Sequence, residues 1–154
     1  LVLMRPIDYP LSAQARFSQN LLEQGSHPTS EKLLSVLRPA SSHVADAFAI
    51  SEGDNVIHLR TLRRVNGVAL CLIDHYFADL QLWPVLQTFT HGSLHDLLRN
   101  RLDIELTRVR TKISARRAQA KESRILGIPN MAPLLCVRTL NHRADANAAA
   151  RAAV

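Results

Sequence analysis

The chain has 154 residues, an apolar fraction of 47% and a formal net charge of +6. This length fits a single domain, and the apolar fraction is sufficient for a hydrophobic core. No apolar run reaches the roughly 18 residues that a membrane-spanning helix requires, so we expect no membrane association. The two cysteines, Cys71 and Cys136, lie in apolar runs without a metal-binding spacing. This favours buried free thiols in a reducing cytoplasm over a disulfide.

The first part of the chain is predicted to be a linker remnant, a helix and then a strand. Residues 1–11 contain two prolines and are interpreted as linker. Ser18 fits the N-cap of a helix, and Gly25 fits the left-handed position that ends it. Residues 29–37 are predicted as a strand, although their leucine spacing would also suit a helix.

The middle of the chain is predicted to be a short helix over residues 41–49 and a β-hairpin over residues 56–77. Asn66-Gly67 lies between two β-rich runs. This is the strongest short-range hairpin signal, because both residues tolerate the positive φ of a tight turn. Arg63 lies among apolar residues on the first strand, and neither face of that strand is wholly apolar. Such a strand either has one face in water or holds an anion.

The second half of the chain is predicted to alternate helices and strands. Ser93 is expected to cap a helix whose apolar face is made of leucines. The expected elements are a loop with a helical turn over 79–89, a helix over 93–102, a half-exposed strand over 104–115, a helix over 115–126 and a buried strand over 133–142. Together with the first half, this order predicts an α+β domain on a mainly antiparallel sheet flanked by helices.

The C-terminal stretch, residues 144–154, differs from the rest of the chain. Its sequence ADANAAARAAV is rich in alanine and has no packing face of any width. We expect it to be disordered or non-native and to lie outside the fold. The domain is therefore predicted to span residues 12–143.

No catalytic motif is present in the sequence: there is no GxSxG, HExxH, P-loop or GxGxxG. The seven histidines form no ligand pair on a single helix, so we expect no metal ion and no cofactor. Asp74-His75 could be an acid–base pair, but a polar position on a half-exposed strand is the favoured interpretation. Basic residues cluster between positions 108 and 121, which leaves nucleic-acid binding open.

Binding of a small anion is better supported by the residues. Ser18 and Ser93 each begin a predicted helix, where free N–H groups and the positive end of the helix dipole attract phosphate-like groups. Arg63, close to the hairpin turn, could supply a bidentate guanidinium. Taken alone, each serine is more often only a cap, and Arg63 is more often a surface cation. The spacing does not show whether the three converge.

Several blocks in a fixed order resemble the UTRA domain, the effector-binding module of GntR-type bacterial regulators of the HutC subfamily. They are ARFSQNLLEQG, TLRRVNG, ALCLIDHYF, SLHDLL, the strand–helix unit that begins with ISA, and PLLCVRTL. The resemblance implies a chorismate-lyase-like fold with a ligand pocket between the sheet and the helices, no catalysis, and a homodimer. The family also has a final strand, which the alanine-rich tail replaces, so we expect a sheet that lacks its last strand.

The resemblance implies a set of ligand-binding residues. Thr61 stands where many relatives have a second arginine. Asp74 corresponds to the family's acidic residue on the second hairpin strand, with Ile73 as the alternative position. Arg138 could face the pocket or a dimer partner. The full predicted set is Arg16, Phe17, Ser18, Thr61, Arg63, Asp74, Ser93, His95 and Arg138.

The function implied is that of a sensing and dimerising domain of a repressor of phosphonate uptake and metabolism genes. The expected effector is a small anion, either a phosphonate, phosphate or a phosphorylated sugar. DNA would be bound only by a winged helix-turn-helix domain that the resemblance places upstream. One alternative is a chorismate-lyase-like enzyme acting on a small aromatic or enol-ether acid. Another is a nucleic-acid binder that uses the basic segment 108–121.

Overall fold

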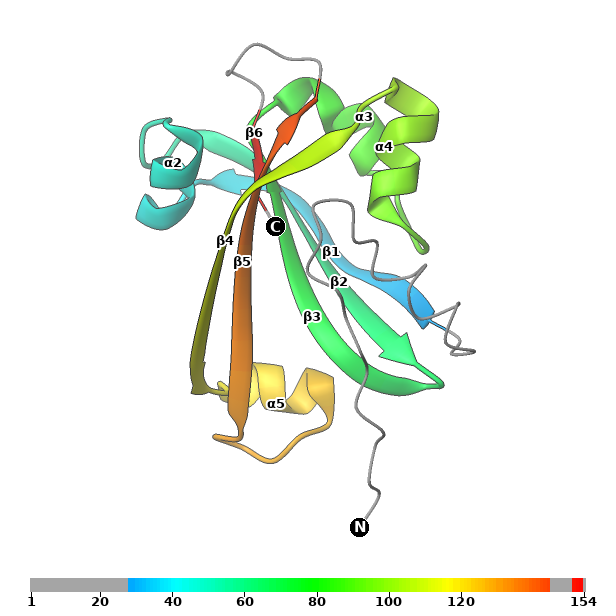
Figure 1. The fold of residues 1–154 in the computed structure, drawn as a ribbon, viewed down its shortest axis with the longest axis vertical. Coiled ribbons are helices and arrows are strands. Elements are labelled where there is room, and N and C mark those ends of the chain that lie inside the picture. The colour runs from blue at the N-terminus through cyan, green and yellow to red at the C-terminus, as the bar shows by residue number, and fades with distance from the viewer. Residues whose placement is uncertain (1–27, 145–150, 154) are drawn as a thin grey trace.

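The computed structural model describes residues 28–144 and the backbone of residues 151–153 (Figure 1). These residues form one six-stranded sheet in the order β1-β2-β3-β6-β5-β4, with every neighbouring pair antiparallel. The strands are β1 (Pro28–Pro39), β2 (Asn55–Val65), β3 (Val68–Phe77), β4 (Leu106–Arg117), β5 (Pro133–Arg143) and β6 (Arg151–Ala153). The helices are α2 (Ser42–Phe48), the 3₁₀ turn η1 (Leu80–Leu82), α3 (Trp83–Leu86), α4 (Leu94–Leu102) and α5 (Ala120–Leu126). The predicted α+β class with a mainly antiparallel sheet is confirmed.

The central hairpin forms at the predicted turn. Asn66 and Gly67 have φ values of 51° and 81°, so both adopt the left-handed conformation that a two-residue hairpin turn requires. The segment 29–37, which could have been a helix, lies within strand β1. The short helix predicted over 41–49 and the helix capped by Ser93 are confirmed as α2 and α4.

Two predictions about the second half of the chain are wrong. Strand β4 continues to Arg117, so helix α5 begins at Ala120 rather than at residue 115. Strand β5 is not buried, because Leu135 and Val137 are 72% and 49% exposed. Apolar composition alone cannot tell a strand in a core from a strand with one open face.

The alanine-rich tail contributes a strand to the sheet. Residues 151–153 pair with β3 on one side and with β5 on the other. The prediction that the sheet lacks a last strand is therefore wrong for these residues. Strand β6 joins the β4–β5 hairpin to β1–β3 at one end only, and beyond it the two halves of the sheet diverge (Figure 1). We call the β4–β5 hairpin the arm.

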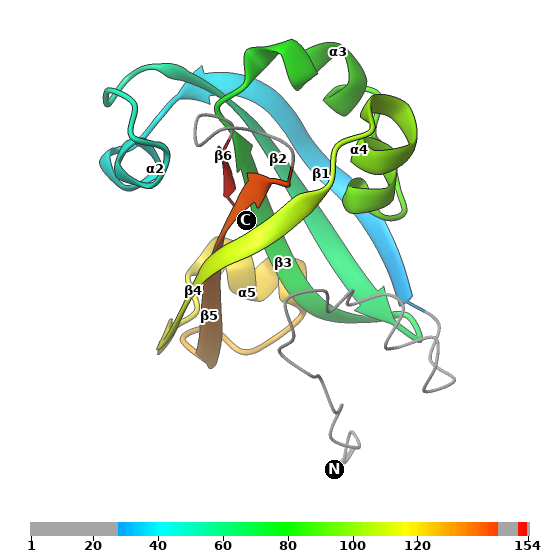
Figure 2. The same cartoon turned by 45° about the horizontal axis from the view of Figure 1, so that its top comes forward.

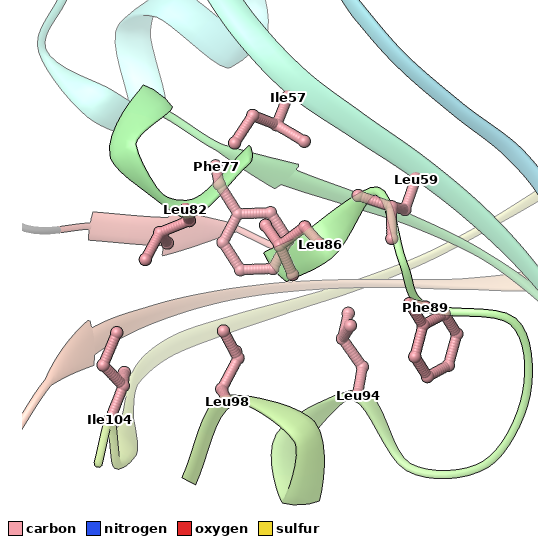
Figure 3. Packing of buried hydrophobic residues seen from close by; sticks show 9 residues of the cluster. All are labelled: Ile57, Leu59, Phe77, Leu82, Leu86, Phe89, Leu94, Leu98 and Ile104. Carbon is pink, nitrogen blue, oxygen red and sulfur yellow. The ribbon is translucent and has the colours of Figure 1, made fainter. Parts of the chain in front are cut away.

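Strands β2 and β3 are covered on both faces. On one face, which we call the front face, apolar side chains pack against η1, α3 and α4 (Figure 3). This core contains Ile57, Leu59, Phe77, Leu82, Leu86, Phe89, Leu94, Leu98 and Ile104. On the opposite face, which we call the back face, α2 covers a second core made of Ala40, Val44, Ala45, Phe48 and Val56. Helix α5 also lies on this side, between the arm and β3 (Figure 2).

Candidate anion-binding site

The register of the central hairpin decides which side chains of β3 reach the front face. Close to the turn, Arg64 pairs with Ala69. Arg63, one residue further from the turn on β2, pairs with Cys71. Leu70 is therefore an extra residue in β3, a β-bulge that shifts the pairing by one. Beyond this bulge, every side chain of β3 lies on the face opposite to the one that a regular hairpin would give it.

The bulge places His75 on the front face and Asp74 on the back face. His75 pairs with Leu59 and Asp74 pairs with Arg60, and residues directly opposite each other share a face. Without the bulge, Asp74 would oppose Leu59 and face the front. The predicted grouping of Asp74 with the front-face candidates is thus corrected. The alternative position, Ile73, does face the front.

Thr61 and His75 form a buried polar pair on the front face. The distance between Thr61 Oγ1 and His75 Nε2 is 3.0 Å, and the two residues are only 1% and 2% exposed. Nδ1 of His75 is also buried and has no hydrogen-bond partner. Burial, with added positive potential from Arg63 and His95, lowers the pKa of His75 to about 3. The imidazole is therefore neutral at pH 7.

Arg63 lies on the same face as this pair and is only 8% exposed. In the sheet, Arg63 pairs with Ser30 of β1 on one side and with Cys71 of β3 on the other. The hydroxyl oxygen of Ser30 is buried and meets no hydrogen-bond partner. Burial raises the pKa of the Cys71 thiol, although the positive charge of Arg63 acts in the opposite direction. The guanidinium of Arg63 and the unpartnered hydroxyl of Ser30 thus lie on the same face as the Thr61–His75 pair.

Helix α4 brings its first turn to this face. Ser93 is the N-cap, and its hydroxyl oxygen accepts a hydrogen bond from the backbone N–H of Asp96 at 3.2 Å. His95 is exposed, yet it is close enough to influence the pKa of His75. Leu94 and Leu98 anchor the helix in the front core (Figure 3). The structure therefore places Thr61, Arg63 and the first turn of α4 on the same face of the sheet, and their role in effector binding stays a prediction.

The loop before α4 is fixed to the edge strand β1. The backbone N–H of Lys32 donates to the carbonyl of Thr90 at 2.9 Å, and that of Gly92 donates to the carbonyl of Ser30 at 3.1 Å. The ammonium of Lys32 also donates to the carbonyl of Gln87 at 3.0 Å. These bonds position the N-terminus of α4 relative to the sheet.

On the back face, Asp74 is the centre of a separate polar cluster. It accepts hydrogen bonds from Arg60 at 2.7 and 2.9 Å and lies 2.7 Å from Nε2 of His58. The ring of His58 stacks on Tyr76 with a centroid distance of 4.5 Å. Burial alone would raise the pKa of Asp74, but the bonds from His58 and Arg60 outweigh it and hold the pKa well below its usual range. The carboxylate is ionised and its partners belong to the back face.

Arg138 also lies away from the front-face group. It is exposed on β5 and opposes Lys112 of β4. Leu140, two residues further along β5, packs against the back-face core, so Arg138 points to that side as well. Arg16, Phe17 and Ser18, and the predicted helix that begins at Ser18, lie outside the described residues.

Two members of this site, His75 and Ser30, are not among the residues predicted from the sequence. The alternation of β3 could have identified His75 only with knowledge of the bulge, and the apolar residues around Leu70 give no sign of one. Ser30 could have been found from its pairing with Arg63, but the register of β1 against β2 is not visible in the sequence.

Within residues 28–144, no group of three or more His, Cys, Asp and Glu side chains is arranged to hold a metal ion. In the same part of the chain, every helix is too short or too polar to cross a bilayer.

A family profile of the UTRA domain matches residues 23–150, which is most of the chain. The chain belongs to the UTRA domain family. UTRA domains are regulatory effector-binding domains and not enzymes, so the alternative of a chorismate-lyase-like enzyme is set aside.

Relatives and solved structures agree with this assignment. The "Probable transcriptional regulator PhnF" of Escherichia coli (strain K12) is 80% identical over 143 residues, covering 93% of this UTRA chain and 59% of that protein. The crystal structure of the PhnF C-terminal domain is 74% identical, with a TM-score of 0.77, and covers 94% of this chain and 91% of that one. The effector domain of PhnF from Mycobacterium smegmatis shares the fold at 20% identity, with a TM-score of 0.78 over 94% of this chain and 89% of that one. The UTRA chain thus spans 59% of the length of its E. coli relative.

The buried His75 predicts a loss of stability in acid. In the unfolded chain His75 binds a proton below its ordinary pKa of 6.5, whereas the folded protein excludes it until about pH 3. The folded state binds fewer protons in this window, so the free energy of unfolding falls as the pH is lowered, by up to about 1.4 kcal/mol per pH unit. Urea denaturation at several pH values should show a shallower slope for His75→Gln. An unchanged slope would mean that other groups cause the loss.

Proposed function

We propose that this UTRA domain is the effector-sensing part of a transcriptional regulator and binds a small anion on the front face of β2 and β3. The observation that carries this proposal is the buried Arg63, which shares its face with the Thr61–His75 pair and, like His95 in the first turn of α4, acts electrostatically on His75. The effector class is a compound with a phosphonate or phosphate group. The resemblance to PhnF favours a role in the control of phosphonate uptake and metabolism genes.

The described side chains suit a tetrahedral oxyanion. A guanidinium can donate two parallel hydrogen bonds to two oxygens of one phosphonate or phosphate. The N-terminus of α4 adds backbone N–H groups and the positive end of a helix dipole. Ser93 and His95 at this helix end can contact the remainder of the effector. Ser30 and His75 each contribute a buried polar atom with no other partner.

We propose that the effector regulates DNA binding by shifting a population. DNA would be bound by a winged helix-turn-helix domain outside this sequence, and the effector would favour one placement of two such domains over another. A shift from 1:99 to 99:1 needs about 5.5 kcal/mol of differential affinity. Charge-assisted bonds from a buried arginine, made in only one of the two states, can supply a large part of it.

The domain is also proposed to form a homodimer through the arm. Ile113 pairs with Val137, and Ala115 pairs with Leu135, so these side chains share one face. Ile113, Leu135 and Val137 are 55%, 72% and 49% exposed; we call them the arm stripe. A second copy is the proposed occupant, because a two-fold axis places the same apolar stripe on itself. Regulators that read paired half-sites are themselves two-fold symmetric.

Replacing Leu135 with aspartate should dissociate the dimer, because it buries a charge at the centre of the apolar contact. Sedimentation velocity should show the unchanged chain as a dimer and Leu135→Asp as a folded monomer. Leu80→Asp is the matched control, since Leu80 is exposed on η1, outside the arm. A dimer that survives Leu135→Asp, or one that Leu80→Asp disrupts equally, would exclude the arm stripe as the interface.

The proposed function is tested by isothermal titration calorimetry of this chain against alkylphosphonates, inorganic phosphate and sugar phosphates. We expect saturable binding of at least one of these compounds, weakened at high salt because the contacts are between charges. A chain that is folded by circular dichroism and binds none of them would contradict the proposal.

A further inference from the structure

We propose that His75 contacts the effector as a neutral hydrogen-bond donor through Nδ1–H, and that Thr61 acts as a positioning residue that fixes this tautomer. This inference rests on the proposed function, because it names a further effector contact in the same site. The effector group it fits is an oxygen of a phosphonate or phosphate, which accepts hydrogen bonds only.

One ring nitrogen of His75 is buried without a hydrogen-bond partner. A buried polar atom without a partner is unfavourable, so such atoms are rare in folded proteins unless a ligand or a water meets them. Nδ1 of His75 is such an atom, on a side chain that is 98% buried and whose other nitrogen is already bonded to Thr61.

The charges around His75 favour an anionic ligand. Arg63 on β2 and His95 on α4 face it, whereas Asp74 and His58 act on it from the back face of the same strands. The thiol of Cys71 lies further along β3, opposite Arg63. The front-face charges that act on His75, those of Arg63 and His95, are therefore positive, whereas the carboxylate of Asp96 in the first turn of α4 is paired with Arg99 at 3.0 Å. An anion is attracted to this position, and a cationic ligand group is repelled.

The hydrogen bond with Thr61 can select the tautomer of His75. A neutral imidazole has one donor and one acceptor nitrogen. The hydroxyl of Thr61 can donate a hydrogen bond to Nε2 of His75, at an Oγ1–Nε2 distance of 3.0 Å. Nε2 is then the acceptor and Nδ1 carries the proton. This arrangement presents a donor to an anion without a formal charge on the ring, and so without the desolvation cost of a second buried cation beside Arg63.

The test uses inorganic phosphate and methylphosphonate as probes at pH 8. For the unchanged chain, nitrogen NMR of the His75 ring should show the proton on Nδ1, and this resonance should shift when either probe is added. Calorimetry in two buffers of different ionisation enthalpy should give the same heat, because a neutral donor takes up no proton. A proton on Nε2, or uptake of about one proton on binding, would overturn the proposal.

Substitutions separate the roles of the two residues. His75→Gln should weaken binding about tenfold, the value of one lost hydrogen bond to a charged group. Thr61→Val should weaken it as well, and Thr61→Ser, which keeps the hydroxyl, should restore it.

Equal affinity of all these chains would overturn the inference while leaving the proposed function intact, provided that Arg63→Ala still loses binding. If the unchanged chain binds neither probe, the proposed function and this inference fail together. The NMR experiment on the unchanged chain decides the tautomer even if a variant fails to fold.

Discussion

Replacement of Arg63 with alanine is expected to abolish measurable binding of phosphonates and phosphate. The guanidinium is buried on the front face and can make two charge-assisted hydrogen bonds to one oxyanion. Such bonds are worth about 1.5–3 kcal/mol each, so the loss of both should weaken binding by a hundredfold or more. Arg63→Lys should recover only part of the affinity, because an ammonium cannot reproduce the planar, bidentate geometry. Calorimetry with methylphosphonate measures both effects.

Arg64 offers a matched control for this experiment. It is the next residue on the same strand and carries the same charge, but it is more exposed and lies 3.4 Å from Glu31. Arg64→Ala removes the same net charge from the domain without removing a donor from the front face. It should leave the affinity within about twofold, since exposed ion pairs contribute little. If Arg63→Ala and Arg64→Ala reduce the affinity equally, the anion responds to overall charge and not to a site on the front face.

Replacement of Leu98 with alanine is expected to have the largest effect on stability among the changes considered. Leu98 is 1% exposed and packs in the front core between α4 and the sheet (Figure 3). Truncating a buried leucine lowers the free energy of unfolding by about 2–5 kcal/mol, because apolar contacts are lost and a cavity remains. Urea denaturation followed by circular dichroism measures this change.

The neighbouring residue provides the comparison. Leu97 lies on the same helix and is only partly buried against the same core. Leu97→Ala should therefore cost clearly less than Leu98→Ala. The front core also fixes the helix that carries Ser93 and His95, so Leu98→Ala should weaken anion binding where the domain is still folded. Equal destabilisation by both changes would contradict the packing described for α4.

Much of the fold is predictable from local signals in the sequence. The turn at Asn66-Gly67 and the cap at Ser93 are chemical requirements of a hairpin and of a helix start, and both form where they are expected. The mixture of charged and apolar residues around Arg63 leaves open a face in water or a bound anion, and the structure places Arg63 on a buried face. Each of these features depends on residues close together in the chain.

The features that the sequence does not reveal depend on pairing between distant residues. The bulge at Leu70 exchanges Asp74 for His75 on the front face, and nothing in the apolar run around it marks the extra residue. Leu135 is apolar yet exposed, because its strand lies in a two-stranded arm. The pairing of residues 151–153 comes from their place between β3 and β5 and not from their alanine-rich composition.

The central claim is that an anion binds on the front face of β2 and β3. The most direct test is a crystal structure of this chain with methylphosphonate. A phosphorus atom is expected beside the guanidinium of Arg63, with oxygens near Nδ1 of His75 and the first turn of α4. A phosphonate bound instead on the back face, beside Arg60, with the front face unoccupied, would contradict it.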